Sequence, residues 1–289
     1  MSPTVEYARE LAAATRAAHL VGEIILRHYG GAPVAVDTKA DDSPVTVADR
    51  EANDAIVATL RTAFPDDAIL SEESPDDQAR LVRSRVWIVD PLDGTRDFVA
   101  RTGDFCVHVA LAVAGTPRVG VVHHPVSGAT YAAIEGGGAF VERDGARTPL
   151  RVGAVAAAAD VRLGVSRLNV GEALRRALGE TGLAGRAVAM GASVKLMAVA
   201  QGTLDAVVSF TAAEREWDTC APEVIVREAG GAYTDLDGHP LRYNQPDTAR
   251  RRGSLVSNGA CHAALLGLLR PFFPGESTGP APAPGGVGQ

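Results

Sequence analysis

Acidic side chains gather in four short segments, each at the end of a predicted helix or strand. The segments are TVADRE with Asp49, LSEES with Glu72 and Glu73, VDPLDGT with Asp90 and Asp93, and REWDTCAPEV with Asp218. Carboxylates that leave water lose solvation unless positive charge lies against them. Histidine is absent from all four segments, and oxygen ligands suit hard cations. The pattern therefore predicts a magnesium site rather than a zinc site.

Each segment also has a structural explanation when it is taken alone. Asp-Gly is a common turn, Glu-Glu is commonly solvated surface, and Thr46-Val-Ala-Asp49 is a helix-capping pattern. Asp218 is a plausible N-cap of the helix that follows it. Only the joint occurrence of the four segments favours a functional site.

The stretch WIVDPLDGTRDF, residues 87–98, carries the most information. Proline cannot continue a central strand ladder, so we expect Pro91 to end the strand and to turn Asp90 and Asp93 to the same side. Gly94 allows the backbone to approach a ligand, and Gly94-Thr95 is expected to open a helix. The free N–H groups at such a helix start can bind a phosphate.

The elements that must position these residues fall into two groups. An amphipathic helix is predicted to end at Gly30-Gly31, and a second helix to run from about residue 47 to 63. Short β-rich runs follow, which predicts helices on an antiparallel-rich sheet. Strands and helices alternate from about residue 162, which predicts an α/β half. We expect domains at 1–153 and 154–272 and a disordered tail at 273–289.

Composition narrows the class of protein. The chain has 289 residues, 46% of them hydrophobic, and a formal net charge of −7. This charge argues against a basic surface that binds nucleic acid or an anionic membrane. Cys106, Cys220 and Cys261 form no CxxC pair, so neither a disulfide framework nor a zinc knuckle is expected, and a cytoplasmic location fits. Signal-peptide and membrane-span patterns are not expected either.

The order of Asp49, SEES, VDPLDGT and EWD followed by AGG resembles a known family. This is the metal-dependent, lithium-sensitive phosphomonoesterase family of inositol monophosphatase, fructose-1,6-bisphosphatase and the 3'(2'),5'-bisphosphate nucleotidases. The likeness extends to about residue 270 and is greatest to bacterial CysQ-type nucleotidases. It implies the layered αβαβα sugar-phosphatase (inositol monophosphatase-like) fold of mixed α/β (α+β) class. It also implies two or three Mg²⁺ ions, a small phosphorylated substrate and a homodimer.

The resemblance further implies roles for individual residues. The metal ligands would be Glu72, Asp90, the Leu92 carbonyl, Asp93 and Asp218. Thr95 paired with Asp49 would activate the attacking water, with help from Glu72. The substrate would contact Asp93, Gly94, Thr95 and Asp218, and the N–H groups of Gly94 and Thr95 would hold its phosphate. In-line displacement by water is then expected.

The choice of substrate depends on fewer residues. Inositol monophosphatases resemble one another in a Glu before the WD motif; here Ser209 or Thr211 stands nearest, and Glu214 fits only after a shift. Lys195 suits a second phosphate, although a solvated lysine at a helix start is the alternative. We expect hydrolysis of 3'-phosphoadenosine 5'-phosphate to AMP, with Ser193 and Lys195 near the retained phosphate. The alternative is an inositol monophosphatase, or a broad phosphatase of sugar phosphates, fructose-1,6-bisphosphate or histidinol phosphate.

Two other interpretations are weaker. An inactive phosphate-binding scaffold would be favoured by loss of a metal ligand or of Thr95, yet these residues are all present. A calcium loop at TDLDGHP, residues 234–240, lacks the closing Glu of an EF-hand, so a hairpin turn explains it better.

Overall fold

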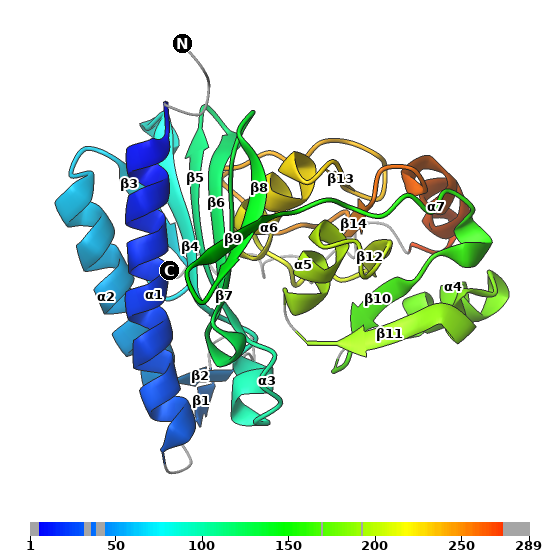
Figure 1. The fold of residues 1–289 in the computed structure, drawn as a ribbon, viewed down its shortest axis with the longest axis horizontal. Coiled ribbons are helices and arrows are strands. Elements are labelled where there is room, and N and C mark those ends of the chain that lie inside the picture. Colours follow the sequence, from blue (N-terminus) through cyan, green and yellow to red (C-terminus); the bar gives the residue numbers. More distant parts are fainter. Residues whose placement is uncertain (1–5, 32–35, 39–43, 169, 192, 274–289) are drawn as a thin grey trace, which may run out of the picture.

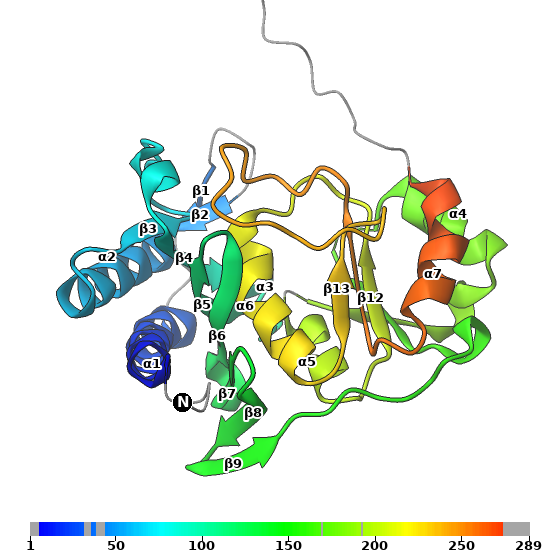
Figure 2. The ribbon, with the colours of Figure 1, turned by 90° about the horizontal axis from the view of Figure 1, so that it is seen from above.

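The structure, a computed structural model, describes residues 6–31, 36–38, 44–168, 170–191 and 193–273. Its elements form five layers in the order helices, sheet, helices, sheet, helices (Figures 1 and 2). The layered mixed fold expected from the sequence is confirmed. Apart from Phe273, the predicted tail lies outside the described residues.

The first layer consists of two long helices, α1 (Ala8–Gly30) and α2 (Val47–Ala63), whose ends agree with the sequence pattern. Small and branched apolar side chains line their inner faces, including Ala14, Val21 and Ile56, all fully buried. Two short antiparallel strands, β1 (Val36–Thr38) and β2 (Pro44–Thr46), lead into α2. Asp49 in the first turn of α2 is hydrogen-bonded to Thr95, two residues after the end of β4 (Arg85–Asp93).

The first sheet has seven strands in the spatial order β3 to β9. All neighbours are antiparallel except β3 and β4, which are parallel, as the antiparallel-rich prediction required. Helix α3 (Thr95–Val99) directly follows β4. The strands are β3 (Ala68–Ser71), β4 (Arg85–Asp93), β5 (Cys106–Val113), β6 (Thr116–His124), β7 (Ala129–Ile134), β8 (Gly138–Arg143) and β9 (Ala146–Pro149).

The second sheet has five strands in the order β11-β10-β12-β14-β13. Strand β10 is parallel to β11 and β12, whereas β14 is antiparallel to both of its neighbours. Helices α4 (Glu172–Glu180) and α7 (His262–Leu269) lie on its outer side, packed in one apolar cluster with its strands. The strands are β10 (Leu163–Ser166), β11 (Ala187–Met190), β12 (Ala206–Ser209), β13 (Ala232–Thr234) and β14 (Ser254–Ser257). Strand β14 and helix α7 are not among the elements predicted from the sequence.

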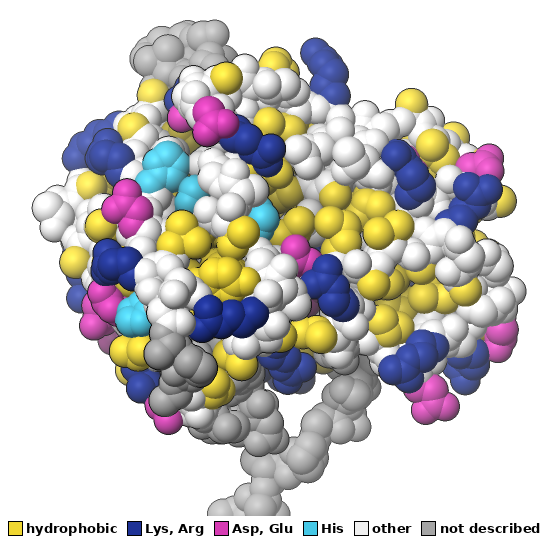
Figure 3. Space-filling model, turned by 60° about the horizontal axis from the view of Figure 1, so that its bottom comes forward, with side chains coloured by type: hydrophobic (Ala, Val, Ile, Leu, Met, Phe, Trp, Pro, Cys, Tyr) yellow, Lys and Arg dark blue, Asp and Glu magenta, His cyan; other side chains and the backbone are white. Residues whose placement is uncertain are grey.

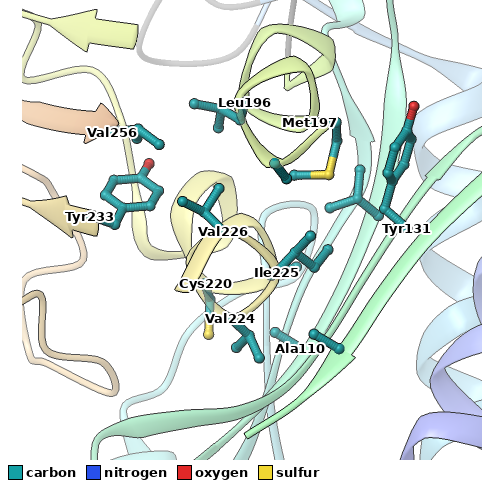
Figure 4. Close-up of a cluster of buried hydrophobic side chains, with 14 of the residues drawn as sticks. Ala110, Tyr131, Leu196, Met197, Cys220, Val224, Ile225, Val226, Tyr233 and Val256 are labelled. Carbon is teal, nitrogen blue, oxygen red and sulfur yellow. The ribbon is translucent and has the colours of Figure 1, made fainter. Parts of the chain in front are cut away.

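The middle layer, α5 (Val194–Ala200) and α6 (Glu216–Glu228), joins the two sheets. Figure 4 shows Met197 and Ile225 of these helices packed towards Tyr131 of the first sheet, while Tyr233 and Val256 come from the second. Side chains from both sheets therefore share one hydrophobic core. Since this core fixes the start of α6 relative to β4, it also fixes the distance between their carboxylates.

The surface agrees with the acidic composition. On the face in Figure 3, Lys and Arg side chains are interspersed with Asp and Glu instead of forming one basic surface. Among the described residues, no helix combines the length and the apolar character needed to cross a membrane.

Candidate functional site

The end of β4 forms the floor of the site. Asp90 pairs with His108 of β5, the register then breaks, and pairing resumes at Asp93. The prediction that Pro91 ends the strand is therefore wrong: an irregularity in the ladder accommodates a residue that lacks an N–H group. Within this irregular stretch the Leu92 amide donates to Oδ1 of Asp90 at 2.9 Å.

Asp218 joins the two β4 carboxylates from the first turn of α6. Carboxylate oxygens of Asp90, Asp93 and Asp218, one from each residue, all lie within 4.8 Å of one another. Asp218 is not the N-cap that its sequence context allowed, because α6 begins at Glu216 and Oδ2 of Asp218 accepts the Arg215 amide at 2.6 Å. That bond orients the Asp218 carboxylate towards β4.

The electrostatics of this cluster favour the binding of a cation. Burial, followed by the charges of Glu72, Asp93 and Asp218, raises the pKa of Asp90 well above its ordinary value. Burial, Glu72 and Asp93 likewise raise the pKa of Asp218. Glu72 follows β3, and its side chain is hydrogen-bonded to Asp90. An all-oxygen donor set with unbalanced negative charge fits a hard divalent cation.

Thr95 and Asp49 meet beside the carboxylate cluster. Gly94 has φ +92°, a conformation that glycine adopts without strain, and it starts α3 with Thr95 as the first residue. Oγ1 of Thr95 donates to Oδ1 of Asp49 at 3.1 Å. Oδ2 of the buried Asp49 accepts the amide and hydroxyl of Thr46. Asp49 therefore caps α2 with one oxygen and bonds Thr95 with the other.

The start of α5 approaches the site from the second half of the chain. The Ser193 amide donates to Oδ2 of Asp93 at 2.7 Å. Lys195 lines a cavity of about 210 Å³ together with Asp93 and Asp218. It also lines a larger cavity of about 330 Å³, which includes Leu174 and Phe210. The structure thus brings Ser193 and Lys195 next to the acidic cluster.

Two residues near the site were missed or discounted. Glu214 lines both cavities, and Ser254 donates to it at 2.8 Å, although sequence spacing had disfavoured it. His108 is fully buried; its Nδ1 donates to the Trp217 carbonyl at 3.1 Å. Its Nε2 lies 3.4 Å from Oδ2 of Asp93 and has no hydrogen-bond partner in the described parts of the chain. A lone histidine within a strand gives no sequence signal, so only the β4–β5 register reveals it.

The TDLDGHP segment forms a turn. The Asp235 amide donates to the His239 carbonyl at 3.0 Å, and Thr234 pairs with Pro240. Asp237 forms ion pairs with Arg252 and Arg270. These contacts agree with the predicted hairpin turn.

Comparisons with known proteins cover most of the chain. A model of the inositol monophosphatase family matches residues 6–271. The 3'(2'),5'-bisphosphate nucleotidase CysQ of Escherichia coli O157:H7 is 37% identical, over 82% of this chain and 94% of its own. A histidinol-phosphatase of Mycobacterium tuberculosis is 37% identical, over 75% and 83%. The crystal structure of CysQ from Bacteroides thetaiotaomicron has a TM-score of 0.73 and 33% identity, covering 88% of this chain and 98% of that one.

Proposed function

Because this chain belongs to the inositol monophosphatase family, we propose that it is a magnesium-dependent phosphomonoesterase that hydrolyses a 3'(2'),5'-bisphosphate nucleotide. The observation that carries the proposal is the group formed by the buried Asp90 and the half-buried Asp93 and Asp218, which lies beside the Thr95–Asp49 hydrogen bond. A group of carboxylates that can bind cations, next to an oriented hydroxyl, is the arrangement needed for attack of water on a phosphate ester.

The residues of this chain have separate tasks in that reaction. Glu72, Asp90, the Leu92 carbonyl, Asp93 and Asp218 would hold Mg²⁺, which when bound would supply the positive charge that a phosphate ester and its leaving oxygen need. The Thr95 hydroxyl donates a hydrogen bond to Asp49, so its oxygen can accept a hydrogen bond from the attacking water. As the water attacks phosphorus and the bond to the leaving oxygen breaks, Thr95 takes one proton from the water and gives its own proton to Asp49, which becomes neutral.

Phosphate binding would use the start of α3. The N–H groups of Gly94 and Thr95 lie at the beginning of this helix, where amides are not used by the helix's own hydrogen bonds. Both amides lie directly after Asp93 in the chain, so the phosphate would sit between them and the bound cations.

Lys195 supports a bisphosphate as substrate. It lies in the wall of both cavities, and the larger one, about 330 Å³, is of ligand-binding size. A nucleotide whose reacting phosphate lies at Asp93 would extend its nucleoside towards Phe210, with the retained phosphate near Lys195 and Ser193. The fitting substrate is 3'-phosphoadenosine 5'-phosphate, which would yield AMP.

Glu214 favours a second candidate. A carboxylate in the wall of both cavities can accept hydrogen bonds from the hydroxyl groups of a polyol. This observation supports an inositol monophosphatase or a broader phosphatase of fructose-1,6-bisphosphate or histidinol phosphate.

Phosphate release by the purified protein with Mg²⁺ distinguishes these candidates. The substrates to compare are 3'-phosphoadenosine 5'-phosphate, inositol 1-phosphate, fructose-1,6-bisphosphate and histidinol phosphate at matched concentrations. A higher kcat/KM for the nucleotide supports the proposal. A higher kcat/KM for another substrate would overturn the proposed substrate but not the proposed metal-dependent phosphatase reaction. Release from none of them favours the inactive scaffold.

A cytoplasmic location is proposed as well, because Cys106, Cys220 and Cys261 are all free and buried, as in proteins of reducing compartments. Lithium sensitivity and a homodimer stay predictions.

A further inference from the structure

Arg167 joins the two halves of the molecule beside the site. It follows β10 of the second sheet, and its guanidinium contacts two carboxylates from the first half of the chain. Nη2 donates to Oδ2 of Asp104 at 2.7 Å, and Nη1 lies 3.4 Å from Oδ1 of Asp97. Asp97 belongs to α3, the helix that begins with Thr95.

Gly191 completes this contact. Its amide donates to Oδ2 of Asp104 at 2.9 Å, the same oxygen that accepts Arg167. A Cβ atom on Gly191 would lie 2.6 Å from Cβ of Asp104 and 2.7 Å from the Asp97 carboxylate. The backbone at Gly191 is therefore pressed against both carboxylates, in a space that only glycine fits.

Both ends of this contact lie two residues from the candidate site. Asp97 is two residues beyond Thr95, whose hydroxyl bonds Asp49. Gly191 is two residues before Ser193, whose amide bonds the metal-ligand candidate Asp93. Moving Gly191 away from Asp104 would shift the Ser193 amide and loosen the orientation of the Asp93 carboxylate.

The contact also depends on positive charge. Asp97 and Asp104 both face the same backbone segment, and their side chains are only 7% and 21% exposed. Without a cation between them, two poorly solvated carboxylates repel each other and separate. A forked guanidinium can bond both at once, which a lysine ammonium does less well.

On the basis of the proposed function, we propose that Arg167 is a positioning residue for the phosphatase reaction. It clamps Asp97 and Asp104 against Gly191, and thereby aligns the Asp93 ligand and the Thr95 hydroxyl across the two halves. The clamp makes metal binding depend on correct docking of the second half onto α3.

A matched control exists at the other end of the same strand. Arg162 precedes β10 and pairs with Asp205 at 2.8 Å, but both partners lie in the second half of the chain. The exposed fractions of the two arginines are similar, 46% for Arg162 and 37% for Arg167. Arg162→Ala therefore removes an Arg–Asp ion pair of the same kind without touching the contact between the halves.

The experiment follows the melting temperature of wild type, Arg167→Ala, Arg167→Lys and Arg162→Ala during titration with Mg²⁺. Both alanine variants should melt lower without metal. In Arg167→Ala the Mg²⁺ concentration at half-maximal stabilisation should rise about tenfold, the effect typical of residues that orient metal ligands. Arg167→Lys should restore part of the loss, and Arg162→Ala should leave this concentration unchanged.

Two outcomes would overturn the inference: an unchanged Mg²⁺ midpoint in Arg167→Ala, or an equal shift in Arg162→Ala. If Arg167→Ala fails to fold, an unshifted midpoint in Arg167→Lys counts against it in the same way. The Mg²⁺ titration needs no substrate. Absence of phosphate release by the wild type would therefore refute the proposed function while the test of Arg167 still stands.

Discussion

Asp93→Asn should stabilise the metal-free protein while it abolishes Mg²⁺-dependent hydrolysis. The Asp93 side chain is 16% exposed and lies with Asp90 and Asp218 in one unbalanced group. An asparagine keeps one oxygen for the Ser193 amide, so the hydrogen bond that holds the carboxylate in place can survive. The variant then removes one negative charge with little other disturbance.

The expected gain follows from the separation of the carboxylates. Two unit charges within 4.8 Å of each other repel by at least about 3.5 kcal/mol at an effective dielectric constant of about 20. The raised pKa values of Asp90 and Asp218 mean that protonation already relieves part of this repulsion. We therefore expect a net gain of about 1–2 kcal/mol in unfolding free energy, or about 2–8 °C in Tm.

The gain should depend on pH in a defined direction. Because the folded-state pKa values of Asp90 and Asp218 are raised, the contribution of these two groups to the stability of the metal-free wild type is largest at low pH and is lost as pH rises through those values. The advantage of Asp93→Asn should accordingly grow with pH. Saturating Mg²⁺ should stabilise wild type and not the variant.

Thermal denaturation in EDTA and in Mg²⁺, at several pH values, measures these effects. Asp205→Asn is the control, because Asp205 is a fully buried carboxylate whose pKa is lowered by Arg162 despite the opposing effect of burial. The same substitution there should reduce Tm. A metal-free Asp93→Asn protein that is less stable than wild type would refute the interpretation of Asp90, Asp93 and Asp218 as a cation-binding site.

Three further predictions concern single side chains. Thr95→Val should lower kcat by about 10²–10⁴ with little change in Tm, since Asp49 keeps its bonds to Thr46; steady-state rates near wild type would contradict the proton path. Lys195→Met should raise KM for 3'-phosphoadenosine 5'-phosphate more than for inositol 1-phosphate, and an unchanged KM ratio would argue against its contact with a second phosphate. Burial and the neighbouring His19 and His124 lower the pKa of His123 from 6.5 to about 4. Wild type should therefore lose up to about 3 kcal/mol of unfolding free energy as pH falls through this range. The variant His123→Gln should not show that loss in acid-denaturation curves. Equal acid sensitivity of wild type and variant would contradict the claim that protonation of His123 causes the loss.

Much of the fold could be predicted because its long helices have clear signals in the local sequence. The apolar periodicity of α1 and α2 and the glycine and proline at their ends set their bounds within the sequence itself. Strand β14 and the passage of β4 through Pro91 could not be predicted in this way. Both depend on pairing with other strands of the sheet, and local strand propensity does not indicate which strands will pair.

The sequence by itself determined the chemistry of the site. Four acidic segments without histidine predict oxygen ligands, and the order of the segments identifies the family, because side-chain type and order are properties of the chain alone. Only the tertiary structure decided which groups meet. The core shared by the two sheets brings Asp218 within 4.8 Å of the β4 carboxylates. The register of the first sheet places His108 against Asp93. The packing of the second half of the chain against the first places Arg167 against Asp97 and Asp104. These contacts join residues that are remote in sequence, so they exist only once long-range packing has closed the chain around them.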